Sequence, residues 1–239
     1  MAGNSWEIPI LANLCVFRTC TMNSIGRLVR ARAADEAWRR GLNIIWRQGA
    51  EIEDERGSRT KELMNLMVVI EDASSCIAPR EYSWTEDRLD EYASQLLSPE
   101  NPGFEYTYGE RLRSWNGEVD QIAEIVNRLK RNPRTRRATA VTWIPPVDHK
   151  REEVPCMVVC DFKIRYSRMN LTAVFRSHDF AGAYPANVYA LTRLLHHVSG
   201  ETGTAPGSIT TLSASAHIYE HDWDWVESLI VKMGGQAGP

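Results

Sequence analysis

The stretch VPCMVVCDFKIRYSRMNLTAVFRSHDFAGAYPANVYALTRLL, residues 154–195, decides the fold. Its β-branched and aromatic residues predict a buried strand over 158–164 and a second over 171–175, joined by a turn at 167–170. Paired as a hairpin, the two strands bring Arg176-Ser177, at the end of the second, back beside Cys156 at the start of the first. We therefore expect a thiol and a guanidinium to be neighbours.

That neighbourhood has a chemical consequence for Cys156. Only a thiolate attacks carbon, and a fixed cation nearby lowers the pKa of a thiol. Most free cysteines are instead small core residues. Cys160, four residues on and expected on the same strand face, is interpreted as one of these. Spacing alone leaves both interpretations open for Cys156.

Composition limits the function classes. A chain of 239 residues with 43% hydrophobic residues can bury one large core, so we expect a single domain over 1–239. The net charge of −3 gives no basic surface for nucleic acid. There is no apolar run of about 18 residues and no signal peptide, which favours a cytoplasmic protein with no membrane partner. Five cysteines indicate reduced thiols, and Cys15 and Cys20 lack partners for a metal site.

Apolar periodicity predicts the remaining elements. Helical spacing is found over 34–46, 84–97, 122–130, 188–198 and 223–232, and strand patterns over 63–70, 138–143 and 209–212, with one or two more in 5–19. Gly49 is the expected C-cap of the first helix and Asp120 the expected N-cap of the third.

Several short motifs occur together in order. They are Tyr108-Gly109, Arg136-Arg137, Pro155-Cys156, Arg176-Ser177-His178-Asp179, Pro185-Ala186-Asn187 and His217-Ile218-Tyr219. In this set the chain resembles the thymidylate synthase superfamily, whose members alkylate C5 of pyrimidine nucleotides. The resemblance covers about 34–225, leaves 1–30 as an N-terminal extension of unassigned role, and is closest to the short archaeal branch of the family.

The resemblance implies a fold and an assembly. The family fold is α/β (α+β), a mixed sheet flanked by helices, with the sheets of two subunits packed back to back in an obligate homodimer. Arg136 and Arg137 would reach across that interface to the partner's phosphate site. As a bare charge run, these arginines would be interpreted as a solvated rim.

The resemblance also implies how a pyrimidine nucleoside monophosphate is held. Arg56, in the polar loop 53–60, would close over the phosphate, although as a bare sequence this loop is a solvated turn; Arg59 is the alternative. Guanidinium suits phosphate because it donates two hydrogen bonds and stays charged. Further contacts to phosphate and sugar would come from Arg176, Ser177, His217 and Tyr219.

The implied chemistry is covalent catalysis. Cys156 would add to C6 of the base so that C5 becomes nucleophilic, with Asn187 presenting its amide to O4 and N3. The one-carbon donor would be 5,10-methylenetetrahydrofolate or a related tetrahydropterin, contacted by Asp179, and no metal is needed. Tyr108 would remove the C5 proton through water, and Glu71 is the candidate for a glutamate that organises this water.

Two products are compatible with this chemistry. Hydride transfer to the C5 substituent gives a methyl group, whereas water gives hydroxymethyl. Because an amide at Asn187 suits uracil, we favour methylation of dUMP to dTMP. The alternative is a hydroxymethylase that forms 5-hydroxymethyl-dUMP, -dCMP or -CMP, with His178 expected near the base. A nucleotide-binding relative without turnover is a third possibility, but the retained Cys156 and Tyr108 argue against it.

Overall fold

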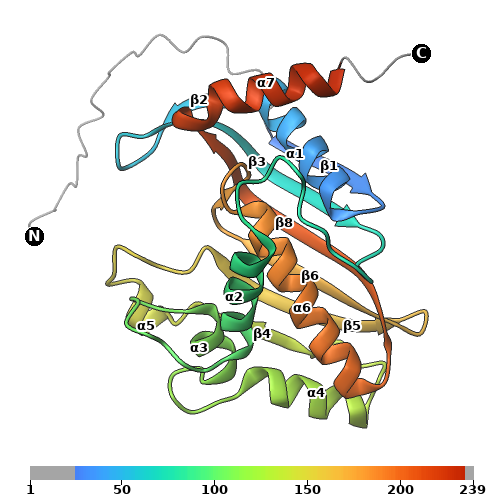
Figure 1. Ribbon diagram of the computed structural model, residues 1–239. Helices are drawn as coiled ribbons and strands as arrows, with labels where there is room; N and C mark the ends of the chain where they lie inside the picture. Colours follow the sequence, from blue (N-terminus) through green and yellow to red (C-terminus); the bar gives the residue numbers. More distant parts are fainter. Residues whose placement is uncertain (1–24, 235–239) are drawn as a thin grey trace, which may run out of the picture.

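The computed structural model describes residues 25–234, which form one eight-stranded mixed sheet with helices packed on it (Figure 1). The strand order is β1-β3-β8-β6-β5-β4, with β2 paired to β3 and β7 paired to β8. The strands are β1 (Ile25–Ala31), β2 (Ala50–Glu53), β3 (Arg59–Ile70), β4 (Thr139–Val141), β5 (Met157–Arg165), β6 (Arg168–Phe175), β7 (His178–Asp179) and β8 (Ala205–Tyr219). The predicted mixed α/β architecture is confirmed, and the strands expected in 5–19 lie outside the described residues.

The helices largely follow the predicted apolar periodicity. They are α1 (Ala34–Gln48), α2 (Glu86–Leu97), α3 (Tyr108–Arg113), α4 (Gln121–Arg131), α5 (Pro145–Asp148), α6 (Tyr184–Thr202), the 3₁₀ turn η2 (Glu220–Asp222) and α7 (Trp223–Gly234). Gly49 is the C-cap of α1, with its N–H donating to the Ile45 carbonyl, and the Asp120 side chain caps α4 by accepting from Ala123 N–H. Both cap predictions are confirmed.

The hairpin of β5 and β6 forms as predicted. The two strands pair antiparallel from Met157 opposite Phe175 to Arg165 opposite Arg168. The predicted turn at 167–170 is wrong, because Tyr166 and Ser167 alone make the connection. Both have positive φ, at 52° and 59°, as a tight two-residue hairpin turn requires.

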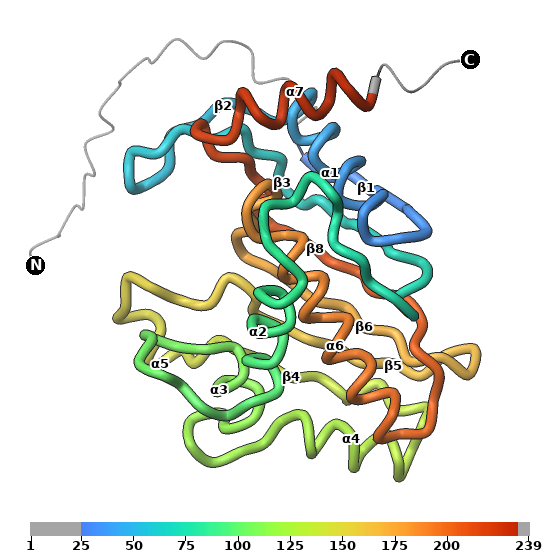
Figure 2. Tube along the Cα trace, in the orientation of Figure 1, coloured from blue at the N-terminus to red at the C-terminus, as the bar shows by residue number. Residues whose placement is uncertain are grey.

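One face of the sheet is covered by helices. α1 contacts β3, α6 contacts β6 and β8, and α2 packs on α6 (Figure 1). Trp38 of α1 is fully buried and donates its indole N–H to the Phe180 carbonyl at 2.7 Å, which ties α1 to the loop before α6. At the far end of the chain α7 packs against α1, so the first and last described parts of the molecule meet (Figure 2).

Strand β8 is longer than the sequence predicts. Instead of covering only 209–212, it runs from Ala205 to Tyr219 and pairs with β3, β6 and β7. Residues 213–219 are therefore part of the sheet rather than a segment that follows it. This central strand carries His217 and Tyr219 to the same edge of the sheet as the start of β5.

No helix within residues 25–234 is long and apolar enough to cross a membrane.

Candidate active site

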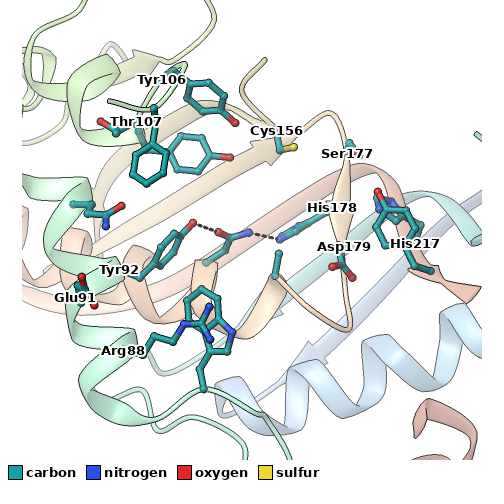
Figure 3. A pocket seen from close by; sticks show the side chains of 17 residues that line it. Arg88, Glu91, Tyr92, Tyr106, Thr107, Cys156, Ser177, His178, Asp179 and His217 are labelled. Atoms are coloured by element: carbon teal, nitrogen blue, oxygen red, sulfur yellow. Dashed lines mark hydrogen bonds between the residues drawn. The ribbon is translucent and has the colours of Figure 1, made fainter. Parts of the chain in front are cut away.

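Two hollows meet at the start of β5. The first is a cavity of about 550 Å³ with aromatic walls that include Trp84, Tyr92 and Tyr106, and the second, of about 440 Å³, has a charged lining. Four residues line both hollows: Cys156, Ser177, His217 and Tyr219. Cys156 therefore stands where an aromatic chamber opens into a charged one, and Figure 3 shows its sulfur at the edge of the first.

Cys156 and Arg176 are neighbours, as the hairpin predicts. The Arg176 backbone N–H donates to the Cys156 carbonyl at 2.8 Å, and its Nη2 lies 3.8 Å from Sγ. The same guanidinium donates to the carbonyls of Val154 and Pro155, each at 3.0 Å. The hairpin and these two carbonyls together hold the cation beside the thiol.

The pKa of the Cys156 thiol nevertheless moves in the direction opposite to the one expected. Burial raises this pKa above its ordinary value, and the opposing effect of the Arg176 charge is smaller. The cation acts in the predicted sense but does not outweigh the loss of hydration. Without a ligand, the thiol is therefore held in its neutral form.

The prediction that Cys156 and Cys160 share a strand face is wrong. The pairing of β5 with β6 shifts register between Met157 and Val159, and such a bulge reverses the alternation of side chains. Met157 is the residue on the side of Cys160, with its sulfur 3.6 Å from the Cys160 sulfur, and both side chains are buried. The bulge leaves Cys156 free to line the cavity, and Cys160 is the core residue predicted.

Tyr108 reaches the cavity because α3 packs unusually close to α2. A Cβ on Gly109 would lie 1.8 Å from the Gln95 carbonyl oxygen, so only glycine permits this approach. The Tyr108 hydroxyl accepts the Met157 backbone N–H at 3.0 Å, one residue after the thiol. Burial raises the pKa of Tyr108 well above its usual value, so its phenol keeps its proton.

Asn187 lies in the first turn of α6, which begins with Tyr184-Pro185. A proline fits there because its missing N–H has no helical partner. The Asn187 Oδ1 accepts from the Tyr92 hydroxyl at 2.7 Å, and its Nδ2 lies 3.2 Å from Nε2 of His178 (Figure 3). His178 is 1% exposed and lines the same cavity directly behind Asn187, close to the position expected for the base.

Asp179 lies in the short strand β7, opposite His217 of β8. Its Oδ1 accepts the backbone N–H groups of Ala181 and Gly182, each at 3.0 Å, which shapes the loop before α6. His217 and Tyr219 face the same way, with ring centroids 4.9 Å apart, and burial lowers the pKa of His217. The structure thus places His217 and Tyr219 where the two hollows meet and Asp179 in the wall of the first.

The loop between β2 and β3 decides between the two candidate phosphate arginines. Arg56 lines the charged hollow, where its Nη2 pairs with Glu153 at 2.8 Å across the opening. Arg59 lines neither hollow, since it pairs with Glu51 and Glu220 and lies over the Trp223 ring. Arg56 therefore lines the charged hollow and Arg59 does not, which favours Arg56 as the candidate.

Glu71 is not brought to the site. Its side chain is half exposed at the end of β3 and pairs with Arg30 at 3.2 Å. The glutamate that lines the cavity is Glu91 of α2, which the sequence reasoning missed. One signal pointed to it: Glu91 precedes Tyr92, which the predicted helix placed on its inward face.

Arg136 and Arg137 lie apart from the Cys156 hollows. Together with Arg128, Arg131 and Arg134 they line a separate surface hollow of about 510 Å³. Within residues 25–234, none of these five side chains makes an ion pair or a hydrogen bond. Five unpaired guanidinium groups in one hollow make a strong site for an anionic partner.

The sequence predicts chemistry without a metal, and the side chains that could bind one are those of His, Cys, Asp and Glu. In the described part of the chain, no three of these side chains form a cluster that could hold a metal ion. The site offers a thiol, hydroxyls, an amide and guanidinium groups, which suit covalent and hydrogen-bond chemistry.

Comparisons with known proteins agree with this geometry. The thymidylate synthase family model matches residues 60–236. A protein of Methanosarcina mazei that carries the provisional name thymidylate synthase is 59% identical over 207 residues, covering 86% of this chain and 95% of the relative. Proteins with the same provisional name from Methanothermobacter thermautotrophicus and Methanocaldococcus jannaschii are 42% and 31% identical, covering 82% and 77% of this chain and 94% and 86% of the relatives. This chain belongs to the thymidylate synthase family.

Proposed function

We propose that this thymidylate synthase family enzyme methylates dUMP at C5 to give dTMP, with Cys156 as its nucleophile. The observation that carries the proposal is the position of Cys156, where a cavity with aromatic walls meets a hollow with a charged lining. The second chamber contains both Arg56 and Arg176. A nucleotide that spans the two would place its sugar against His217 and Tyr219.

The first chemical step is addition of the thiolate to C6 of uracil. Because burial raises the pKa of Cys156, the thiol must lose its proton after the nucleotide enters, and Arg176 stabilises the thiolate that forms. Negative charge then spreads to O4 of the base. An amide N–H of Asn187 would stabilise that charge, as hydrogen-bond donors aimed at developing charge do.

Removal of the C5 proton needs a base, and the protonated Tyr108 phenol cannot itself be that base. Tyr108 keeps its proton and already accepts the Met157 N–H, so its proposed role is to position a water. Glu91 takes over the role expected of Glu71, because it is a carboxylate at the wall of the same cavity. Such general acid–base help is worth about 10²–10⁴-fold in rate.

The residues present fit a reduced folate. Trp84 and Phe104 offer flat apolar walls, and Arg88, stacked on Trp84 at 3.9 Å, offers a cation for a carboxylate tail. Asp179 lines the same cavity and could accept pterin N–H groups. 5,10-methylenetetrahydrofolate or a related tetrahydropterin would supply the one-carbon unit and the hydride.

The phosphate site supports a homodimer. Arg56 is already paired with Glu153, and two of the Arg176 nitrogens bind backbone carbonyls, so a dianionic phosphate gains little positive charge from one subunit. We propose that Arg136 and Arg137 of the partner subunit supply the rest, which accounts for their lack of side-chain partners among residues 25–234 of their own subunit.

The open face of the sheet supports the same assembly. A row of apolar side chains crosses six strands in direct register on the face opposite the helices: Leu28, Met67, Leu212, Val174, Val159 and Val141. Leu28 is 57% exposed and Met67 39% exposed in one chain. An apolar row of this length indicates a covered surface, and a second copy packed back to back would cover it.

The experiment is to incubate the purified protein with 5,10-methylenetetrahydrofolate and, separately, dUMP, dCMP and CMP, and to weigh the products. A gain of one methyl group on dUMP supports the proposal. A gain of one hydroxymethyl group on any of the three would instead identify the hydroxymethylase alternative. A covalent adduct with 5-fluoro-dUMP that is lost in Cys156→Ala tests the nucleophile separately.

The dimer has its own test. Cys156→Ala and Arg136→Ala/Arg137→Ala are each expected to be inactive, because one lacks the nucleophile and the other the phosphate ligands given to its partner. Mixed and reassembled, the two variants should regain activity, since some sites then combine an intact Cys156 with intact arginines. Failure to regain activity in a sample shown to contain mixed dimers would refute the exchange.

A further inference from the structure

Four side chains from four different elements form one continuous chain beneath the cavity. The Tyr92 hydroxyl of α2 donates to Asn187 Oδ1 at 2.7 Å, Asn187 Nδ2 lies 3.2 Å from His178 Nε2, and His178 Nδ1 lies 2.9 Å from Ser213 Oγ. The two dashed lines between Tyr92 and His178 in Figure 3 mark the first two of these contacts. Of these four hydrogen-bonded residues, only Asn187 has been given a role in the proposed reaction.

The imidazole in this chain is neutral and fixed. His178 is fully enclosed, stacked on Phe175 with ring centroids 3.8 Å apart, and burial lowers its pKa to about 3. A neutral imidazole carries one N–H, so one ring nitrogen donates and the other accepts. Each link in the chain must therefore point the same way, either from Tyr92 toward Ser213 or from Ser213 toward Tyr92.

The direction decides what Asn187 offers to a base. When Tyr92 is the first donor, Oδ1 faces Tyr92 and Nδ2 faces His178, and the amide has one lone pair and one N–H left for the cavity. Those groups match N3–H and O4 of uracil. The reverse direction turns the amide over and matches N3 and the amino group of cytosine instead.

Two features favour the direction that begins at Tyr92. A phenol is a stronger acid than a serine hydroxyl and is therefore the better terminal donor. Reversal would also leave the Tyr92 proton without an acceptor among the described residues, because Asn187 is the only side chain that its hydroxyl contacts. Leaving a buried donor unpaired is costly.

We propose that Tyr92 and His178 are positioning residues that make the enzyme select uracil over cytosine by fixing the orientation of the Asn187 amide. The inference rests on the proposed function, since it takes Asn187 as the residue that reads the base. It adds two residues to the site whose role is to orient the amide that reads the base.

The decisive variant is Tyr92→Phe, which removes one hydroxyl from a residue that otherwise keeps its ring. Tyr189→Phe is the matched control, because the Tyr189 hydroxyl also joins α6 to α2, by a 2.7 Å bond to Asp90, but does not contact Asn187. Dissociation constants of dUMP and dCMP for the full-length protein are measured by calorimetry, with competition where binding is weak.

The expected result is a change in preference, not a general loss. The ratio of the dCMP to the dUMP dissociation constant should fall about tenfold in Tyr92→Phe, within the range that a two-bond base contact is worth. It should stay within about twofold of wild type in Tyr189→Phe. Equal weakening of both nucleotides in Tyr92→Phe, or an unchanged ratio, would overturn the proposal.

A pair of variants at His178 gives an independent readout. His178→Gln keeps an acceptor for the Asn187 N–H, whereas His178→Leu removes it, so Gln should retain more of the uracil preference at similar thermal stability. Equal ratios in the two variants count against a positioning role. If the wild-type protein itself fails to bind dUMP or prefers dCMP, the proposed function fails; if it prefers dUMP and the variants do too, only this inference fails.

Discussion

The buried ion pair between Arg111 and Asp148 provides a quantitative test of the structure. Arg111, in α3, donates from Nη2 to Asp148 Oδ1 at 2.8 Å, and the two side chains are 5% and 0% exposed. The second carboxylate oxygen accepts the Ile144 N–H at 2.6 Å. Because α3 also carries Tyr108, this pair anchors one wall of the active site to α5.

Arg111→Met leaves the Asp148 carboxylate buried without its cation. Removing one partner of a buried pair costs about 3–5 kcal/mol in the free energy of unfolding. For a chain of this size each kcal/mol lowers Tm by about 2–4 °C, so a fall of about 6–20 °C is expected. Thermal unfolding followed by circular dichroism measures it.

Two further variants make the test specific. Arg113→Met breaks the half-exposed pair of Arg113 with Asp120, two residues along α3, and should cost less than about 1 kcal/mol. Arg111→Met/Asp148→Asn removes both charges and keeps an acceptor for Ile144, so it should be more stable than Arg111→Met alone. Equal Tm values for Arg111→Met and Arg113→Met, or a double variant less stable than the single, would refute the reasoning.

Three further predictions follow from burial and close packing. Burial raises the pKa of Cys156, so the rate at which iodoacetamide alkylates this thiol in the free enzyme should still increase above the ordinary thiol pKa of about 8.5. A rate profile whose inflection lies below that value would contradict the account. Gly109→Ala places a methyl group against the Gln95 carbonyl and should lower the free energy of unfolding by at least about 1–3 kcal/mol and reduce kcat through Tyr108, as urea titration and steady-state kinetics will show. His178 has a lowered pKa in the folded state, so protonation of its imidazole favours the unfolded chain. The free energy of unfolding should therefore be highest above about pH 6.5 and fall below that pH by up to about 1.4 kcal/mol per pH unit. A urea midpoint that rises on acidification would contradict this expectation.

Local patterns in the sequence predicted most of the fold. The hairpin of β5 and β6, the helix α4 with its Asp120 cap, and the meeting of Arg176 with Cys156 all depend on residues close in sequence or on one strand pairing. The bulge after Met157 was not predictable in this way, because a period-two pattern carries no mark of an inserted residue. One such irregularity places Cys156 and Cys160 on different faces of the strand, against the expectation that they share one.

The site itself was predicted only where a motif names the residue. Glu71 was chosen because it follows the expected strand, but at the end of that strand its side chain pairs with Arg30 of β1 and does not line the cavity. Glu91 reaches the cavity because α2 packs on α6, a contact between distant parts of the chain that no local periodicity reveals. For the same reason the hydrogen bond from Tyr92 to Asn187, between residues 95 positions apart, was not foreseen.

The fold keeps the Cys156 thiol neutral while the group that would stabilise its thiolate is already beside it. Burial favours the neutral thiol, while the carbonyls of Val154 and Pro155 fix the Arg176 guanidinium 3.8 Å from the sulfur. The cation is therefore already in place before any thiolate exists, and no side chain has to move to stabilise it. Because stabilising groups that are oriented in advance need no reorganisation at the moment of reaction, the closure of the hairpin is itself part of the catalytic machinery.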